Sequence, residues 1–160
     1  MTSFKIQNKF LVGLASWLSE IQLGGIESRE RTRFVNILVE RIQENEKFRL
    51  ELLDKYTEKD EEGNKKKKMN EFEEEVWDLS PENTILYTKE FGELMDEDFV
   101  MDILDGNKQK IKVMKEVVLN TNYVFGPRDT DSPQEKIAKI RQMNDYDSWC
   151  QAFEKVEFAE

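Results

Sequence analysis

The sequence predicts an all-α protein, or one nearly so: a single domain over residues 1–160, with a long second helix and at most one short strand. About five to seven helices are expected from the apolar spacing. Three observations predict this class. Only 7 residues are Gly and 3 are Pro, which leaves few places for turns. The 10 Phe, 4 Tyr and 3 Trp are too many for a disordered chain, although 36% of residues are charged. Apolar residues also recur at spacings of three and four.

The first expected helix covers residues 4–23 and is apolar over most of its circumference. Lys9, Gly13, Ser16 and Glu20 recur at helical spacing and form one narrow polar stripe. Trp17 and Leu18 lie away from this stripe, and we therefore expect both to be buried. Two interpretations stay open, because such a helix fits the centre of a domain and also half of a dimer interface.

The second expected helix begins near Ser28 and ends near Tyr56. A coiled-coil-like seam runs along it: Phe34, Leu38, Ile42, Asn45, Phe48, Leu52 and Tyr56. Glu27 with Arg31, and Glu51 with Lys55, have the spacing of favourable ion pairs on the outer face.

The rest of the chain reads as shorter elements. They are, in order, a loop at 57–68, a helix at 69–79, a break at Ser80-Pro81, an extended segment or helix start at 84–88, a helix at 91–104, a helix at 107–119 and a connector at 120–131. Ser132-Pro133-Gln134-Glu135 is a capping box, followed by an apolar face of Ile137, Ile140 and Met143. Asp147-Ser148 has the pattern of a further cap, so residues 132–158 are expected to form a helical pair, with a C-terminal subdomain as an option.

The missing residue types exclude several kinds of chemistry. There is no His, so the chain has no Ser-His or Cys-His pair and no His ligand for zinc. Its single Cys, Cys150, has no partner for an intrachain disulfide. The glycine spacing matches neither a phosphate-binding loop nor a dinucleotide fingerprint. We therefore expect no enzymatic activity, no cofactor and no metal site.

The longest apolar run bears on location. It covers residues 10–18, which is too short to cross a bilayer. The expected location is cytoplasmic, in a host cell, with no membrane partner.

Charge is the most informative feature, because the formal charge of -10 is unevenly spread. Residues 69–107 carry one base, Lys89, against thirteen acids. Ten of these acids are the predicted partner-binding residues: Glu71, Glu73, Glu74, Glu75, Asp78, Glu93, Asp96, Glu97, Asp98 and Asp102. Such a block repels nucleic acid and attracts basic surfaces, and it can imitate the closely spaced phosphates of a duplex. The alternative is pairing within the chain, with Lys65–Lys68 and with Lys108, Lys112 and Lys115.

Residues 49–79 resemble small helical proteins encoded in bacteriophages and prophages of low-GC bacteria. In those proteins a long helix is followed by a Lys-Asp-Glu-x-Gly-Asn turn and an acidic Glu-Phe-x-x-Glu helix. The matching residues here are Leu53, Lys55, Tyr56, Lys59, Asp60, Glu61, Gly63, Asn64, Glu71, Phe72 and Glu75. The resemblance implies a viral accessory protein and carries no activity with it.

Two functional hypotheses follow. The first is a non-catalytic, phage-encoded inhibitor whose acidic face, 69–107, occupies a basic, nucleic-acid-binding site on a host protein such as a defence nuclease. Its partner would be a protein with a basic surface, with no direct contact to nucleic acid. The second is a helical scaffold or virion protein that assembles through the first two helices, and a homodimer is included in this alternative.

Overall fold

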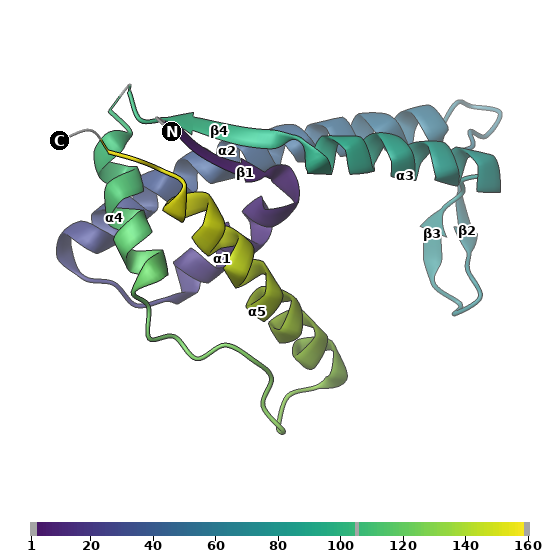
Figure 1. The fold of residues 1–160 in the computed structure, drawn as a ribbon. Coiled ribbons are helices and arrows are strands. Elements are labelled where there is room, and N and C mark those ends of the chain that lie inside the picture. The colour runs from purple at the N-terminus through teal and green to yellow at the C-terminus, as the bar shows by residue number, and fades with distance from the viewer. Residues whose placement is uncertain (1–2, 105, 159–160) are drawn as a thin grey trace. The chain divides into compact units, whose positions relative to one another are not determined.

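The computed structural model describes residues 3–104 and 106–158. Its elements, labelled in Figure 1, are β1 (Ser3–Gln7), the 3-10 helix η1 (Asn8–Phe10), α1 (Leu11–Glu20), α2 (Gly25–Tyr56), β2 (Lys67–Met69), β3 (Glu75–Trp77), α3 (Pro81–Asp96), β4 (Asp98–Asp102), α4 (Lys108–Leu119) and α5 (Pro133–Glu154). The described part holds five α-helices and four short strands in two antiparallel sheets. The prediction of an all-α protein with at most one strand is therefore wrong, and the chain is a mixed helix and strand protein.

The contacts of the chain gather into two compact units. Unit 1 comprises Met1–Ile42 and Asp98–Glu160, and unit 2 comprises Gln43–Glu97. Helix α2 is continuous from Gly25 to Tyr56, so it contributes its first part to unit 1 and its last part to unit 2.

The sheet of unit 1 pairs β1 with β4, and Figure 1 shows the two strands side by side. Phe4 lies opposite Met101 and Ile6 opposite Phe99, and all four side chains are buried on one face of the sheet. This alternation has the period of a strand. We expected helix at both places because the apolar residues of each strand continue the apolar spacing of the adjoining helix, α1 or α3.

The core of unit 1 lies against this sheet. Helix α5 contacts β1, α1 and α4, and these elements enclose the largest fully buried side chains. Trp17 and Leu18 are both 0% exposed, which confirms their predicted burial. The rings of Phe4 and Phe153 lie 4.6 Å apart, and those of Trp17 and Trp149 lie 5.6 Å apart. Helix α1 therefore belongs to the core of unit 1.

A close approach explains one glycine of α1. A Cβ atom added at Gly13 would lie 3.2 Å from Cζ2 of Trp149. A side chain at this position would therefore require the buried indole of Trp149 to shift by a few tenths of an ångström.

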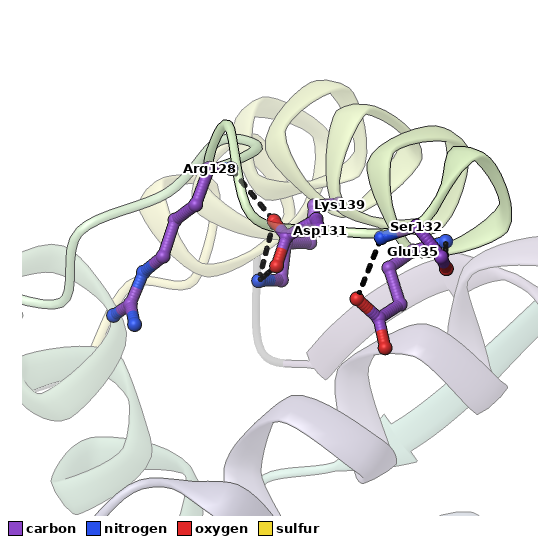
Figure 2. Close-up of polar contacts among 5 residues, drawn as sticks. All are labelled: Arg128, Asp131, Ser132, Glu135 and Lys139. Carbon is purple, nitrogen blue, oxygen red and sulfur yellow. Dashed lines mark hydrogen bonds and ion pairs between the residues drawn. The ribbon is translucent and has the colours of Figure 1, made fainter.

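Helix α5 begins with the predicted capping box, drawn in Figure 2. The amide of Glu135 donates to Oγ of Ser132 (3.2 Å), and the amide of Ser132 donates to Oε2 of Glu135 (3.0 Å). The helix then continues to Glu154 without the expected break at Asp147-Ser148. Burial of Trp149 and Phe153 holds this segment helical, so the expected helical pair is a single helix.

The first turns of α5 contribute little to the core. Ile137, Ile140 and Met143 form the expected apolar face, yet they are 67%, 42% and 44% exposed. Only Trp149, Ala152 and Phe153 of this helix are buried.

A prediction concerns Asp131, just before α5 (Figure 2). Its carboxylate accepts hydrogen bonds from Nζ of Lys139 (2.8 Å) and from the amide of Arg128 (2.6 Å), which lower the pKa of Asp131. A lowered pKa means that the ionised carboxylate stabilises the fold above its ordinary pKa, and that this stabilisation is lost as pH falls through the lowered value. We expect Asp131→Asn to reduce the melting temperature at neutral pH.

The difference between this variant and the wild type should disappear in acid. Asp129→Asn, an exposed neighbour, is the matched control and should change the melting temperature at neither pH. An equal loss for Asp131→Asn at neutral and at acidic pH would contradict the assignment of the effect to this ionised carboxylate.

Unit 2 contains a β-hairpin where a helix was expected at 69–79. Strands β2 and β3 pair Lys67 with Trp77 and Met69 with Glu75. Just before β2, the amide of Lys66 donates to the carbonyl of Glu58 (2.8 Å), so backbone pairing extends beyond the two strands. The physical reason lies in the composition: the run of glutamates at 71–75 has no base at i+4 to support a helix, while Val76 and Trp77 favour strands.

Helix α3 begins at the predicted Ser80-Pro81 break, where Oγ of Ser80 accepts from the amide of Asn83 (3.1 Å). Residues 84–88 lie inside this helix, so of the two alternatives the extended segment is wrong and the helical one is right, although the helix already starts at Pro81. The hydroxyl of Tyr56 donates to Oε1 of Glu90 (2.6 Å), and this bond joins the end of α2 to α3.

The seam of α2 is mostly covered within the chain. Phe34, Leu38, Asn45, Leu52 and Tyr56 are buried, whereas Phe48 is 38% exposed. The two expected ion pairs are replaced by other contacts.

Arg31 donates to the carbonyls of Leu18 and Ile21 at the end of α1, and Nζ of Lys55 lies 3.5 Å from Oε1 of Glu90.

Across the described ranges, no helix has both the length and the apolar content needed to cross a bilayer.

Candidate protein-binding surface

Unit 2 holds almost all of the net charge. Its residues, 43–97, include 9 basic and 18 acidic side chains, a formal charge of -9. The remaining residues have 15 basic and 16 acidic side chains, a formal charge of -1. The chain thus combines a nearly neutral unit that contains the large core with a strongly acidic one.

The structure divides the ten predicted binding residues into three groups. Five belong to the hairpin segment: Glu71, Glu73, Glu74, Glu75 and Asp78. Three lie at the end of α3: Glu93, Asp96 and Glu97. The last two, Asp98 and Asp102, lie on β4 and belong to unit 1. The structure therefore brings eight of the ten into unit 2, and the hairpin carries the largest group.

The hairpin tip, residues 70–75 including the first residue of β3, is held by the side chain and backbone of Asn70. Its Oδ1 accepts from the amides of Phe72 and Glu74 (2.9 Å each), and its amide donates to the carbonyl of Glu74 (2.9 Å). Glu73 adopts a left-handed backbone conformation with φ 59°, which non-glycine residues rarely adopt. The tip is consequently a defined turn that directs its side chains outward.

The acids and bases of the hairpin occupy different parts of it. At the base, Nζ of both Lys65 and Lys67 lies 4.8 Å from the centre of the Trp77 ring. Nζ of Lys68 lies 3.5 Å from a carboxylate oxygen of Asp78. These contacts commit three of the lysines to the base of the hairpin.

The tip acids have no such partners. Glu71, Glu73 and Glu75 form no ion pair with any described residue, and Glu74 accepts from the amide group of Asn70 (3.2 Å). Pairing within the chain therefore accounts for Asp78 but leaves the tip charges exposed to solvent. The lysines of α4 were the other expected partners of these acids. They lie in unit 1, where Lys115 donates to the carbonyl of Val156 (2.9 Å).

The end of α3 is also electrostatically unfavourable for folding. Glu93 and Asp96 lie in the last turn, Glu97 is the C-cap, and that turn contains no basic residue. A helix C-terminus carries partial negative charge, so acids at this end destabilise the helix.

The exposure of two apolar residues of the hairpin was not predicted. Phe72 is 73% exposed and Met69 is 62% exposed, although both were assigned to the apolar face of a helix. Asn70 is the signal that could have found the tip, because Asn side chains accept hydrogen bonds from amides two residues further on and favour turns.

A separate cavity of about 690 Å³ lies in unit 1. Three carboxylates, Glu20, Glu27 and Glu116, line it together with Tyr123, and no Lys or Arg is among its described lining residues. Among the described residues, no group of three or more Cys, Asp or Glu side chains is placed to hold a metal ion.

No family model matches the chain, and the comparisons with curated proteins and with solved structures found no match. The resemblance of residues 49–79 to phage proteins stays a prediction, and the phage and anti-defence associations have no support. The acidic Glu71–Glu75 segment, expected as a helix from that resemblance, is the hairpin tip and the start of β3. Fold and surface together define a class: a two-unit helix and strand protein with one strongly acidic unit.

The role of Asn70 leads to a second prediction. We expect Asn70→Ala to speed amide hydrogen exchange at Phe72 and Glu74 by about tenfold, because two backbone donors lose their acceptor. The matched control is Asn64→Ala in the neighbouring turn, since the Asn64 side chain makes no hydrogen bond to a described residue. Unchanged exchange at both amides in Asn70→Ala would show that Asn70 does not hold the tip.

Proposed function

We propose that the protein is a non-catalytic binding protein whose unit 2 occupies a basic, nucleic-acid-binding surface on a protein partner. The observation that carries this proposal is the division of charge, with -9 on residues 43–97 and -1 on the rest of the chain. We place this activity in the cytoplasm.

Electrostatics supports this choice of partner. A surface with closely spaced carboxylates attracts proteins that have evolved to bind phosphates, and it raises the rate at which they associate. The same charge repels nucleic acid and anionic lipid surfaces. Glu71, Glu73 and Glu75 form no ion pair with a described residue, so they can contact such a partner without breaking one.

The assembly hypothesis is less well supported by the same structure. It required the apolar face of α1 and the seam of α2 to be free for other copies. Leu14, Trp17, Phe34 and Leu38 are instead 0% exposed within one chain. A dimer through unit 2 would bring two surfaces of like charge together, which opposes association.

Affinity capture tests the proposal. The wild-type chain, immobilised, is exposed to a bacterial lysate at low salt and then eluted with a salt gradient, and the proteins that elute are identified. We expect a basic, nucleic-acid-binding protein that elutes at moderate salt, because exposed charges are screened over about 8–10 Å near physiological ionic strength. Retention of only acidic or neutral proteins would contradict the proposal.

A further inference from the structure

The hairpin tip exposes an aromatic side chain at the centre of a group of acids. Phe72 follows Glu71, precedes Glu73 and Glu74, and is 73% exposed. Met69, at the end of β2, is 62% exposed. Leaving large apolar side chains in water costs stability, and single aromatic residues dominate many protein interfaces.

The turn also keeps Phe72 in its outward position. Its amide donates to Oδ1 of Asn70 (2.9 Å), and the next residue, Glu73, holds the left-handed conformation with φ 59°. A side chain presented on a preorganised turn loses little conformational entropy on binding, which favours affinity.

Resting on the function proposed above, we propose that Phe72 is the anchor of the interface. Its ring enters an apolar pocket that is surrounded by Lys or Arg side chains on the partner protein, while Glu71, Glu73 and Glu74 contact those bases. Met69 packs against the rim of the same pocket.

Charge complementarity selects this occupant among the alternatives. Nucleic acid and anionic lipid are repelled by the tip glutamates. The tip of a second copy carries the same acids and is repelled as well. A small cation would satisfy the acids but would leave Phe72 in water, so a basic protein surface with an apolar pocket satisfies both features.

Other exposed apolar residues of unit 2 are poorer anchors. Ile85, on α3, is 69% exposed, and Leu50, on α2, is 47% exposed. Both lie on regular helices near a lysine, Lys89 and Lys47 respectively, and neither is presented by a strained turn. Ile85 therefore provides a control that matches Phe72 in exposure and unit.

The test is a selection from a displayed library of random-sequence peptides. The wild-type chain is the bait, and the chain with Phe72→Ala is the counter-bait. We expect the selected peptides to combine several Lys or Arg with at least one large apolar residue. A synthetic peptide of the most enriched sequence should bind Phe72→Ala about tenfold more weakly than the wild type. Phe72→Trp should restore binding, and Ile85→Ala should leave it unchanged.

Each outcome separates the anchor from the underlying charge proposal. Basic peptides that bind the wild type and Phe72→Ala equally would overturn the anchor and leave the acidic surface in place. Selected peptides without basic residues, or no enrichment of any peptide on the wild-type bait, would overturn both. Equal melting temperatures of wild type and Phe72→Ala are expected, because the side chain is exposed. A dimer seen by sedimentation in the wild type and lost in Phe72→Ala would make a second copy the occupant and overturn the proposal.

Discussion

Leu18→Ala is expected to lower the free energy of unfolding by about 2–5 kcal/mol, which is the range for truncating a buried leucine. Leu18 is 0% exposed in the core of unit 1, near the packed rings of Trp17 and Trp149. The truncation removes buried apolar contacts and leaves a cavity that the surrounding helices can close only in part. Chemical denaturation, followed by tryptophan fluorescence, measures the change.

Val12→Ala is the control on the same helix, because Val12 is 59% exposed and should cost little. Equal losses from Leu18→Ala and Val12→Ala would contradict the placement of α1. If Leu18→Ala weakened association between chains and left the stability of the monomer unchanged, α1 would be an interface and the assembly hypothesis would replace ours.

Neutralising the hairpin tip is expected to have the largest effect on binding. Replacing Glu71, Glu73, Glu74 and Glu75 with Gln removes four negative charges without removing a described ion pair. We expect the affinity for the captured partner to fall by about tenfold or more at low salt, mainly through slower association. Surface plasmon resonance over a salt series measures both rates.

The control removes the same charge from unit 1, by replacing Glu20, Glu27, Glu40 and Glu116 with Gln. These four side chains are exposed, so the substitutions test net charge alone. A clearly smaller loss is expected from this set. Equal losses from both sets would mean that overall charge, and not the hairpin, controls binding.

Local capping chemistry was the most predictable part of the fold. Ser132 and Glu135, and Ser80 with Pro81, mark helix starts through hydrogen bonds that involve only neighbouring residues. The long helix α2 was predicted nearly to its ends from its apolar spacing. The burial of Trp17 and Leu18 also followed from helical periodicity alone.

The strands were missed because their pairing is nonlocal. Strand β1 pairs with β4 across more than ninety residues, so neither strand contains the information that stabilises it. In the hairpin, the contacts of Trp77 with Lys65 and Lys67 stabilise the paired strands. The apolar spacing of Met69, Phe72 and Val76 is that of a helix, and it therefore predicts the wrong structure.

The candidate surface was predictable in composition and not in arrangement. Counting charges along the chain found the acidic block, and all ten predicted residues lie within it. The block runs on into β4, so Asp98 and Asp102 belong to unit 1. Phe72 was unrecognised because an aromatic residue between glutamates looks like the buried face of an amphipathic helix.

Competition with duplex DNA for the captured partner is the most direct test of the central claim. Labelled duplex DNA is bound to that partner, and increasing amounts of the wild-type chain or of the hairpin-tip variant are added at physiological salt. The account predicts that the wild type displaces the DNA completely, because unit 2 occupies the same basic surface, and that the variant displaces it poorly. A ternary complex of partner, DNA and wild-type chain would contradict the claim.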